Sequence, residues 1–65
     1  MKIIIKKSGK QEIKQKFSGS GKDLLAKLKI NPEEVLLLKN NELVDISEKL
    51  SDTDIVEILS VVSGG

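Results

Sequence analysis

The feature that most constrains the fold is a single short helical segment lying between strand-like segments in a chain of 65 residues. Leu24, Leu25 and Leu28 recur at helical spacing, and lysines occupy the opposite side of this segment. Asn31 and Pro32 close it, because the residue before a proline avoids the helical region and proline cannot continue the hydrogen-bond ladder. The sequence therefore predicts one helix of about ten residues, in a single domain with a small core.

Two strands precede this helix. Residues 1–6 are rich in β-branched side chains and flanked by lysine, which is typical of a strand. Residues 11–17 alternate, with Ile13, Gln15 and Phe17 on one face and charged side chains on the other, as in a half-buried antiparallel strand. A turn at residues 8–10 joins the two strands into a hairpin.

Three further strands follow the helix, over residues 34–39, 43–44 and 55–62. Asn40 and Asn41 form a turn that tolerates positive φ. The polar loop between the last two strands places Ile46 and Leu50 as anchors into the core. The predicted order is β-β-α-β-β-β.

This order predicts an α+β architecture, a mixed sheet with one helix packed across one face. The apolar first and last strands suit central, parallel positions, with the last strand between the first and the third. Alternation then sets the inner face, which consists of Ile3, Ile5, Ile13, Phe17, Val35, Leu37, Val56 and Ile58.

The outer face of the same strands carries several aliphatic side chains, namely Ile4, Leu36, Leu38, Leu59 and Val61. Apolar patches on a surface usually mark contacts with partners, so we predict a partner-binding surface there. A dimer that covers these side chains, or an assignment of the two faces that is wrong, would account for the same pattern.

Composition excludes several functional classes. The chain has no cysteine and no histidine, which argues against a metal site and against a Ser-His or Cys-His nucleophile. All 11 basic residues are lysines, and they balance 10 acidic residues, so the net charge of +1 argues against a nucleic-acid partner. The apolar runs are too short to span a membrane, and no signal peptide is evident, so we expect a cytoplasmic protein.

The segment Ser20-Gly21-Lys22-Asp23 admits two interpretations. It contains the Gly-Lys pair of a phosphate-binding loop, but it lacks the earlier glycine, and aspartate stands where serine or threonine would hold magnesium. As a helix start, Ser20 is a good N-cap, and Asp23 places a negative charge in the first turn. We favour the helix start and predict no catalytic residue and no metal ligand.

Four segments carry a resemblance to a known family: residues 1–6 (MKIIIK), 20–28 (SGKDLLAKL), 31–35 (NPEEV) and 61–65 (VVSGG). Together they resemble the ubiquitin-like β-grasp proteins, in particular the small sulfur carriers of thiamine and molybdopterin synthesis (ThiS/MoaD-like) and the archaeal ubiquitin-like small modifier proteins. The resemblance implies a β-grasp domain over residues 1–62 and a flexible C-terminal tail over residues 63–65. Thr53-Asp54 stands where the family often has a Gly-Asp turn.

For such a protein the resemblance implies that Gly64 and Gly65 bring a C-terminal carboxylate to an E1-like adenylating enzyme (ThiF/MoeB-like). This chain would bind no cofactor, since ATP and Mg are supplied at the activating enzyme. Adenylation followed by conversion to a thiocarboxylate would make the chain a sulfur carrier and not an enzyme. Its further partner would be a sulfur-acceptor synthase in thiamine, molybdopterin or tRNA thiolation.

Two alternatives remain open at this point. The first is a ubiquitin-like modifier, conjugated through Gly65 to lysines of target proteins. The second is a passive β-grasp interaction module in which the two terminal glycines have no chemical role.

Overall fold

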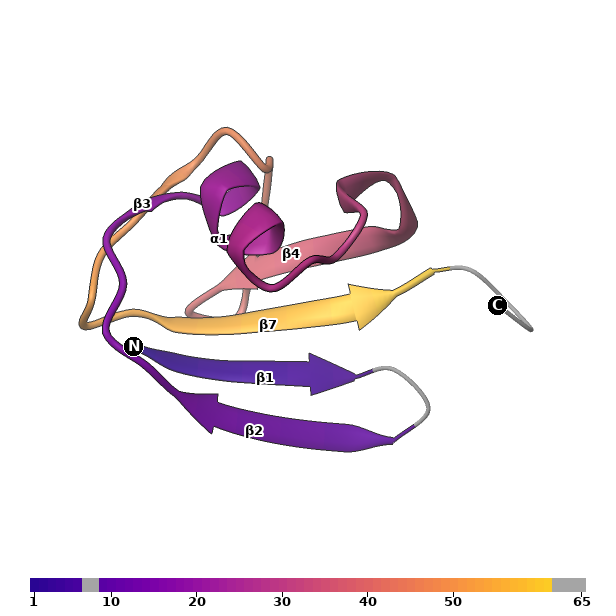
Figure 1. The fold of residues 1–65 in the computed structure, drawn as a ribbon, viewed down its shortest axis with the longest axis horizontal. Coiled ribbons are helices and arrows are strands. Elements are labelled where there is room, and N and C mark those ends of the chain that lie inside the picture. The colour runs from indigo at the N-terminus through magenta and orange to yellow at the C-terminus, as the bar shows by residue number, and fades with distance from the viewer. Residues whose placement is uncertain (7–8, 62–65) are drawn as a thin grey trace.

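A five-stranded mixed sheet with one helix across one face forms the body of the molecule (Figure 1). The computed structural model describes residues 1–6 and 9–61. The strands of the large sheet are β1 (Lys2–Lys6), β2 (Lys10–Lys14), β4 (Val35–Lys39), β5 (Glu42–Val44) and β7 (Ile55–Ser60), in the order β2-β1-β7-β4-β5. This is the predicted β-grasp architecture.

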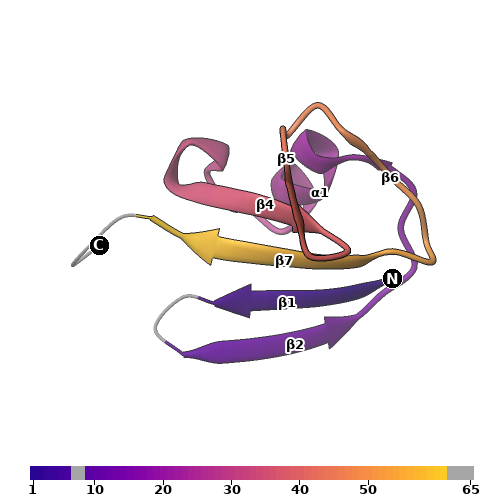
Figure 2. The ribbon, with the colours of Figure 1, turned by 180° about the vertical axis from the view of Figure 1, so that it is seen from behind.

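Strand β7 lies at the centre of the sheet, parallel to β1 and antiparallel to β4 (Figures 1 and 2). Both the parallel pairing and the central position were predicted from the apolar character of the two strands. Strand β7 ends at Ser60, and the predicted boundary between domain and tail lies outside the described residues.

A second, two-stranded sheet was not predicted. It pairs β3 (Gly19–Ser20) with β6 (Lys49–Leu50). Strands of two residues are too short to show a period of two, so alternation gives no signal for them. Their pairing fixes the loop before β7 and buries Leu50 completely, which confirms Leu50 as an anchor.

Strand β2 is shorter than predicted, because the chain leaves the sheet edge after Lys14. Gln15 still donates a backbone hydrogen bond to the Met1 carbonyl oxygen, at 3.0 Å. The backbone N–H of Phe17 instead donates to the carboxylate of Asp52, at 3.0 Å. The Phe17 side chain thereby packs against the core without belonging to a strand.

Helix α1 (Gly21–Lys27) begins as predicted and ends early. The Ser20 hydroxyl accepts a hydrogen bond from the Asp23 N–H at 3.1 Å, which confirms the N-cap. At the other end Lys29 adopts φ +60°. Its N–H donates to Ala26, and the Ile30 N–H donates to Leu25, the paired bonds of a Schellman motif. The helix therefore stops before the Asn31–Pro32 signal is reached.

Asn31 and Pro32 begin a separate turn of 3₁₀-helix, η1 (Pro32–Glu34), which sequence reasoning did not predict. The Asn31 side-chain oxygen accepts a hydrogen bond from the Glu33 N–H at 3.0 Å. This turn delays the start of β4 to Val35.

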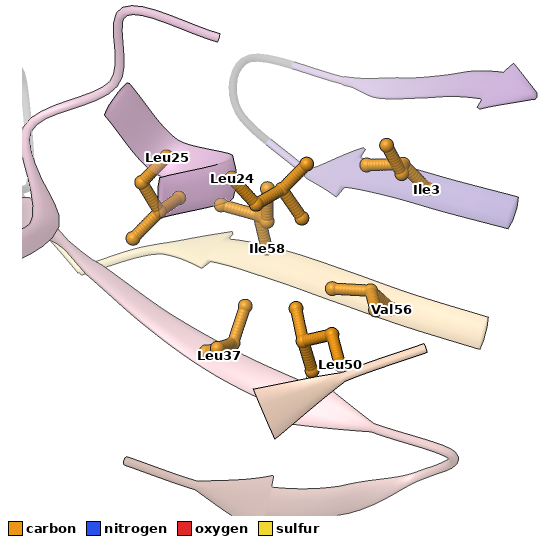
Figure 3. Close-up of a cluster of buried hydrophobic side chains, with 7 residues drawn as sticks. All are labelled: Ile3, Leu24, Leu25, Leu37, Leu50, Val56 and Ile58. Atoms are coloured by element: carbon orange, nitrogen blue, oxygen red, sulfur yellow. The ribbon is translucent and has the colours of Figure 1, made fainter. Parts of the chain in front are cut away.

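The core lies between the helix and the inner face of the sheet (Figure 3). Its fully buried side chains are Ile3, Leu24, Leu25, Leu37, Leu50, Val56 and Ile58. The other predicted inner-face residues, Ile5, Ile13, Phe17 and Val35, are partly buried and pack against this cluster. Alternation thus assigned the inner face correctly, except that Phe17 packs against the core from outside the sheet.

Candidate functional site

The predicted reactive residues, Gly64 and Gly65, lie outside the described residues. The structure does describe the backbone that leads to them. Strand β7 ends at Ser60, and the N–H of Val61 donates a hydrogen bond to the carbonyl oxygen of Glu34 at 2.9 Å. The chain is therefore held by the fold as far as Val61.

An apolar pair lies beside this point on the outer face of the sheet. Leu36 on β4 stands directly opposite Leu59 on β7. Leu36 is 43% exposed, and Val61, which follows β7, is 53% exposed. Three of the predicted surface residues therefore lie together where the chain leaves the sheet.

Leu38 extends the apolar area to the far edge of the sheet. It pairs across the hairpin with Leu43 on β5, and Leu43 is 62% exposed, the most exposed of the large aliphatic side chains in the described part. Sequence reasoning placed Leu43 in a strand but not in the surface. The two-residue turn at Asn40 and Asn41 sets the register that places Leu43 opposite Leu38, so the signal was present.

Ile4 lies on the outer face, as alternation predicted, but it is only 9% exposed, so the expectation that it forms part of an exposed patch is wrong. Lys2 and Lys6 flank it along β1, while Glu12 and Glu57 stand opposite it on the neighbouring strands. Two ion pairs join these four side chains: Lys2–Glu12 at 3.3 Å and Lys6–Glu57 at 3.4 Å. Their aliphatic stems account for the burial of Ile4.

We define the apolar patch as the four outer-face leucines together with Val61: Leu36, Leu38, Leu43, Leu59 and Val61. It covers β4, β5 and the carboxyl end of β7. Its four leucines lie in strands, and Val61 directly follows β7 and is held by its hydrogen bond to Glu34, so their relative positions are fixed by the fold. A rigid apolar surface of this kind suits docking of a protein, because burial of apolar area stabilises association.

The start of helix α1 offers no phosphate-binding loop. Its first N–H groups already donate within the protein: Gly21 to the Glu48 carbonyl at 2.9 Å, and Lys22 to the Ile46 carbonyl at 2.7 Å. A Cβ at position 21 would lie 3.0 Å from the Ile46 oxygen and against Leu37, so glycine serves this close approach. The segment is a capped helix start, as favoured from the sequence.

Among the carboxylates that the structure describes, three have a lowered pKa, and all belong to the loop before β7, away from the apolar patch. Hydrogen bonds from Ser47 lower the pKa of Asp45, and the backbone N–H of Phe17 lowers that of Asp52. The backbone N–H of Ser51 and the amide of Asn40 lower the pKa of Asp54. Each carboxylate closes a turn or ties the loop to a neighbouring segment, so these groups stabilise the fold.

No cluster of three metal-ligating side chains occurs within residues 1–6 and 9–61. In the same part of the chain, no helix is long and apolar enough to cross a membrane. The surface that the structure brings together is therefore the apolar patch and the strand end leading to the glycines.

Comparison with known proteins identifies a family and a relative. The model of the ThiS family matches residues 3–65. The chain is also similar to the sulfur carrier protein TtuB of Thermus thermophilus, at 28% identity over 65 residues, covering 100% of each chain.

Proposed function

The chain belongs to the ThiS family, and from this premise we propose that it is a sulfur carrier that reacts through the α-carboxylate of Gly65. The observation that carries the proposal is the extent of the family match, which reaches residue 65 and therefore includes Gly64 and Gly65. The full-length similarity to a protein named a sulfur carrier supports the same role.

In the proposed reaction a carboxylate oxygen of Gly65 attacks the α-phosphorus of ATP, and pyrophosphate leaves. Hydrosulfide then attacks the carbonyl carbon of the acyl-adenylate. A C–S bond forms, the C–O bond to AMP breaks, AMP leaves with that electron pair, and the S–H proton passes to water. The product is a thiocarboxylate in which sulfur replaces one carboxylate oxygen. An E1-like adenylating enzyme in the cytoplasm supplies ATP, Mg and the catalytic groups, because proteins of this family are carriers and not enzymes.

In this reaction the fold positions the backbone that leads to the reacting carboxylate. The backbone is fixed by hydrogen bonding as far as Val61. Four residues follow Val61, and an extended chain spans at most about 3.5 Å per residue, so the carboxylate reaches at most about 14 Å from Val61. The enzyme surface that holds the strand end must therefore lie close to its ATP site.

The apolar patch provides such a contact. Leu36, Leu59 and Val61 surround the strand end on the outer face, so an enzyme that binds them also receives the residues that follow. Glycine suits the last two of these positions, Gly64 and Gly65, because the absence of a Cβ lets the backbone approach a phosphate closely.

Exchange of labelled pyrophosphate into ATP tests the first step. With the activating enzyme from the same cell, the wild-type chain is expected to support exchange, and a variant lacking Gly64 and Gly65 is expected to lose it while melting at the same temperature. Equal exchange with both proteins would contradict the proposal and favour a passive interaction module.

A further inference from the structure

The outer face has a second half beside the apolar patch, and this half is basic. Lys2 and Lys6 on β1 stand directly opposite Lys14 and Lys10 on β2. Like charges opposite each other on adjacent strands destabilise a sheet. The hairpin ladder of β1 and β2 has five residue pairs, and two of them are such lysine pairs. This arrangement lowers the stability of the folded hairpin.

Neighbouring carboxylates compensate this charge only in part. Glu12 pairs with Lys2 at 3.3 Å, and Glu57 pairs with Lys6 at 3.4 Å. The face therefore carries four lysines against two glutamates. Positions that break a local folding rule are frequently functional. These lysines therefore indicate a function other than stabilising the sheet.

We propose that this lysine half (Lys2, Lys6, Lys10 and Lys14) is the basic flank of the docking surface for the activating enzyme, whose matching surface carries carboxylates beside an apolar area. This inference rests on the proposed function. Lys6 stands opposite Leu59 across the β1–β7 pairing, so the basic flank and the apolar patch adjoin along the centre of the sheet. One partner contacting the centre of the sheet meets both halves.

The one-sided charge gives the docking a direction. All four lysines lie on β1 and β2, whereas the patch lies on β4, β5 and β7. A partner with carboxylates on one side of its apolar area matches this face in one orientation only. That orientation fixes where Val61, and hence the reacting carboxylate, enters the enzyme. Charged flanks of this kind increase association rates and fix the register of a complex.

A protein surface fits these observations better than a nucleic acid does. Stacking on bases requires exposed aromatic side chains, and the chain has a single aromatic residue, Phe17, which packs against the core. The adjoining leucines give an apolar contact that a phosphate backbone does not match. The net charge of the whole chain is only +1.

The double variant Lys10→Glu/Lys14→Glu tests the proposal. The new glutamates would face Lys6 and Lys2 across the ladder, so the melting temperature is expected to stay equal or rise. In pyrophosphate exchange at low salt, the KM for the carrier is expected to rise about tenfold with kcat unchanged. The matched control, Lys22→Glu/Lys49→Glu, makes the same charge change on exposed residues of α1 and β6 and is expected to keep the wild-type KM.

The salt dependence of KM and the binding of a cellular RNA pool distinguish docking of the enzyme on these lysines from a nonspecific effect of charge and from binding of nucleic acid. The wild-type KM is expected to rise with salt, and the KM of the double variant to depend on salt much less. Equal KM values for wild type and double variant, or an equal increase in both double variants, would overturn the proposal. An unchanged KM with weakened binding of a cellular RNA pool would assign the lysines to nucleic acid and would overturn it too. Absence of exchange with the wild-type chain would instead refute the proposed function.

Discussion

The side-chain amide of Asn40 bonds to the carboxylate of Asp54 at 3.1 Å, joining the turn between β4 and β5 to the residue before β7. The side-chain oxygen of Asn40 also accepts a hydrogen bond from the Ile55 N–H at 3.0 Å, and its own N–H donates to the Ile55 carbonyl at 2.8 Å. One asparagine thus fixes the point at which the central strand starts.

Replacement of Asn40 by glycine removes both side-chain bonds while keeping the left-handed backbone. We expect a loss of about 1–3 kcal/mol in the free energy of unfolding, measured by denaturant titration. Asn41 is the matched control, because it also has positive φ, and the described residues include no hydrogen-bond partner of its side chain. Asn41→Gly should change stability by about 0.5 kcal/mol or less. Equal effects at the two positions would show that the bonds of Asn40 do not stabilise the fold.

Asp54 predicts a pH dependence of stability. The backbone N–H of Ser51, followed by the amide of Asn40, lowers the pKa of Asp54 in the folded state. The folded state therefore binds this proton less tightly than the unfolded state does, and protonation favours unfolding. Stability from this group is present above the unfolded pKa of about 3.9 and is lost as the pH falls through the lower folded pKa.

In Asp54→Asn the decline of stability in acid should be shallower than in the wild type, although the variant is less stable at neutral pH. Urea midpoints measured from neutral pH down to acid would show this. Parallel curves for the two proteins would mean that Asp54 titrates alike in the folded and unfolded states.

Lys29 holds the left-handed position at the end of α1, with φ +60°. The Cβ of lysine is sterically strained in this conformation, and glycine has no Cβ. Lys29→Gly should therefore raise the free energy of unfolding by about 0.5–1 kcal/mol. Lys27→Gly, inside the same helix, should lower it by about 1 kcal/mol. A thermal unfolding series on the three proteins checks both signs. Destabilisation by Lys29→Gly would contradict the Schellman ending.

The apolar patch is best tested at Leu36, which is 43% exposed and lies opposite Leu59. Leu36→Asp should leave the melting temperature nearly unchanged, since the side chain already faces solvent. It should raise the KM for the carrier in pyrophosphate exchange about tenfold or more, because a charge would enter an apolar contact. Thr53→Asp, an exposed position in the loop before β7, serves as the charge-matched control. An unchanged KM for Leu36→Asp would exclude the patch from the contact.

The sheet could be predicted from the sequence because its inner face follows a strict period of two. Ile3, Val56 and Ile58 are buried as alternation requires. The strand order followed from the apolar character of the two central strands. Predictions of this kind need only the local pattern and the shortness of the chain.

The differences arise where individual hydrogen bonds, which leave no hydrophobic pattern in the sequence, decide the local structure. Helix α1 ends at Lys27 without a glycine to mark its end, because Lys29 adopts positive φ and the Ile30 N–H donates to the Leu25 carbonyl oxygen. The β3–β6 pairing joins segments about thirty residues apart. The turn at Thr53-Asp54 is closed by the Asp54 side chain, which accepts from the Ser51 N–H at 2.8 Å, so the usual glycine is not needed.

In the candidate site, the outer-face position of each residue could be predicted, but its exposure could not. Ile4 is covered by ion pairs that join three strands, and strand register is needed to recognise them. Leu43 enters the patch through pairing with Leu38. The two halves of the outer face likewise became evident only when β1 and β2 were aligned residue by residue.

The most direct test of the central claim is the intact mass of the protein after incubation with ATP, a sulfur donor and the activating enzyme of the same cell, with fragmentation to locate the change. We predict the mass increase for exchange of one oxygen by sulfur, confined to Gly65. If an enzyme proven competent on another carrier leaves Gly65 an ordinary carboxylate, the chain does not carry sulfur in this way.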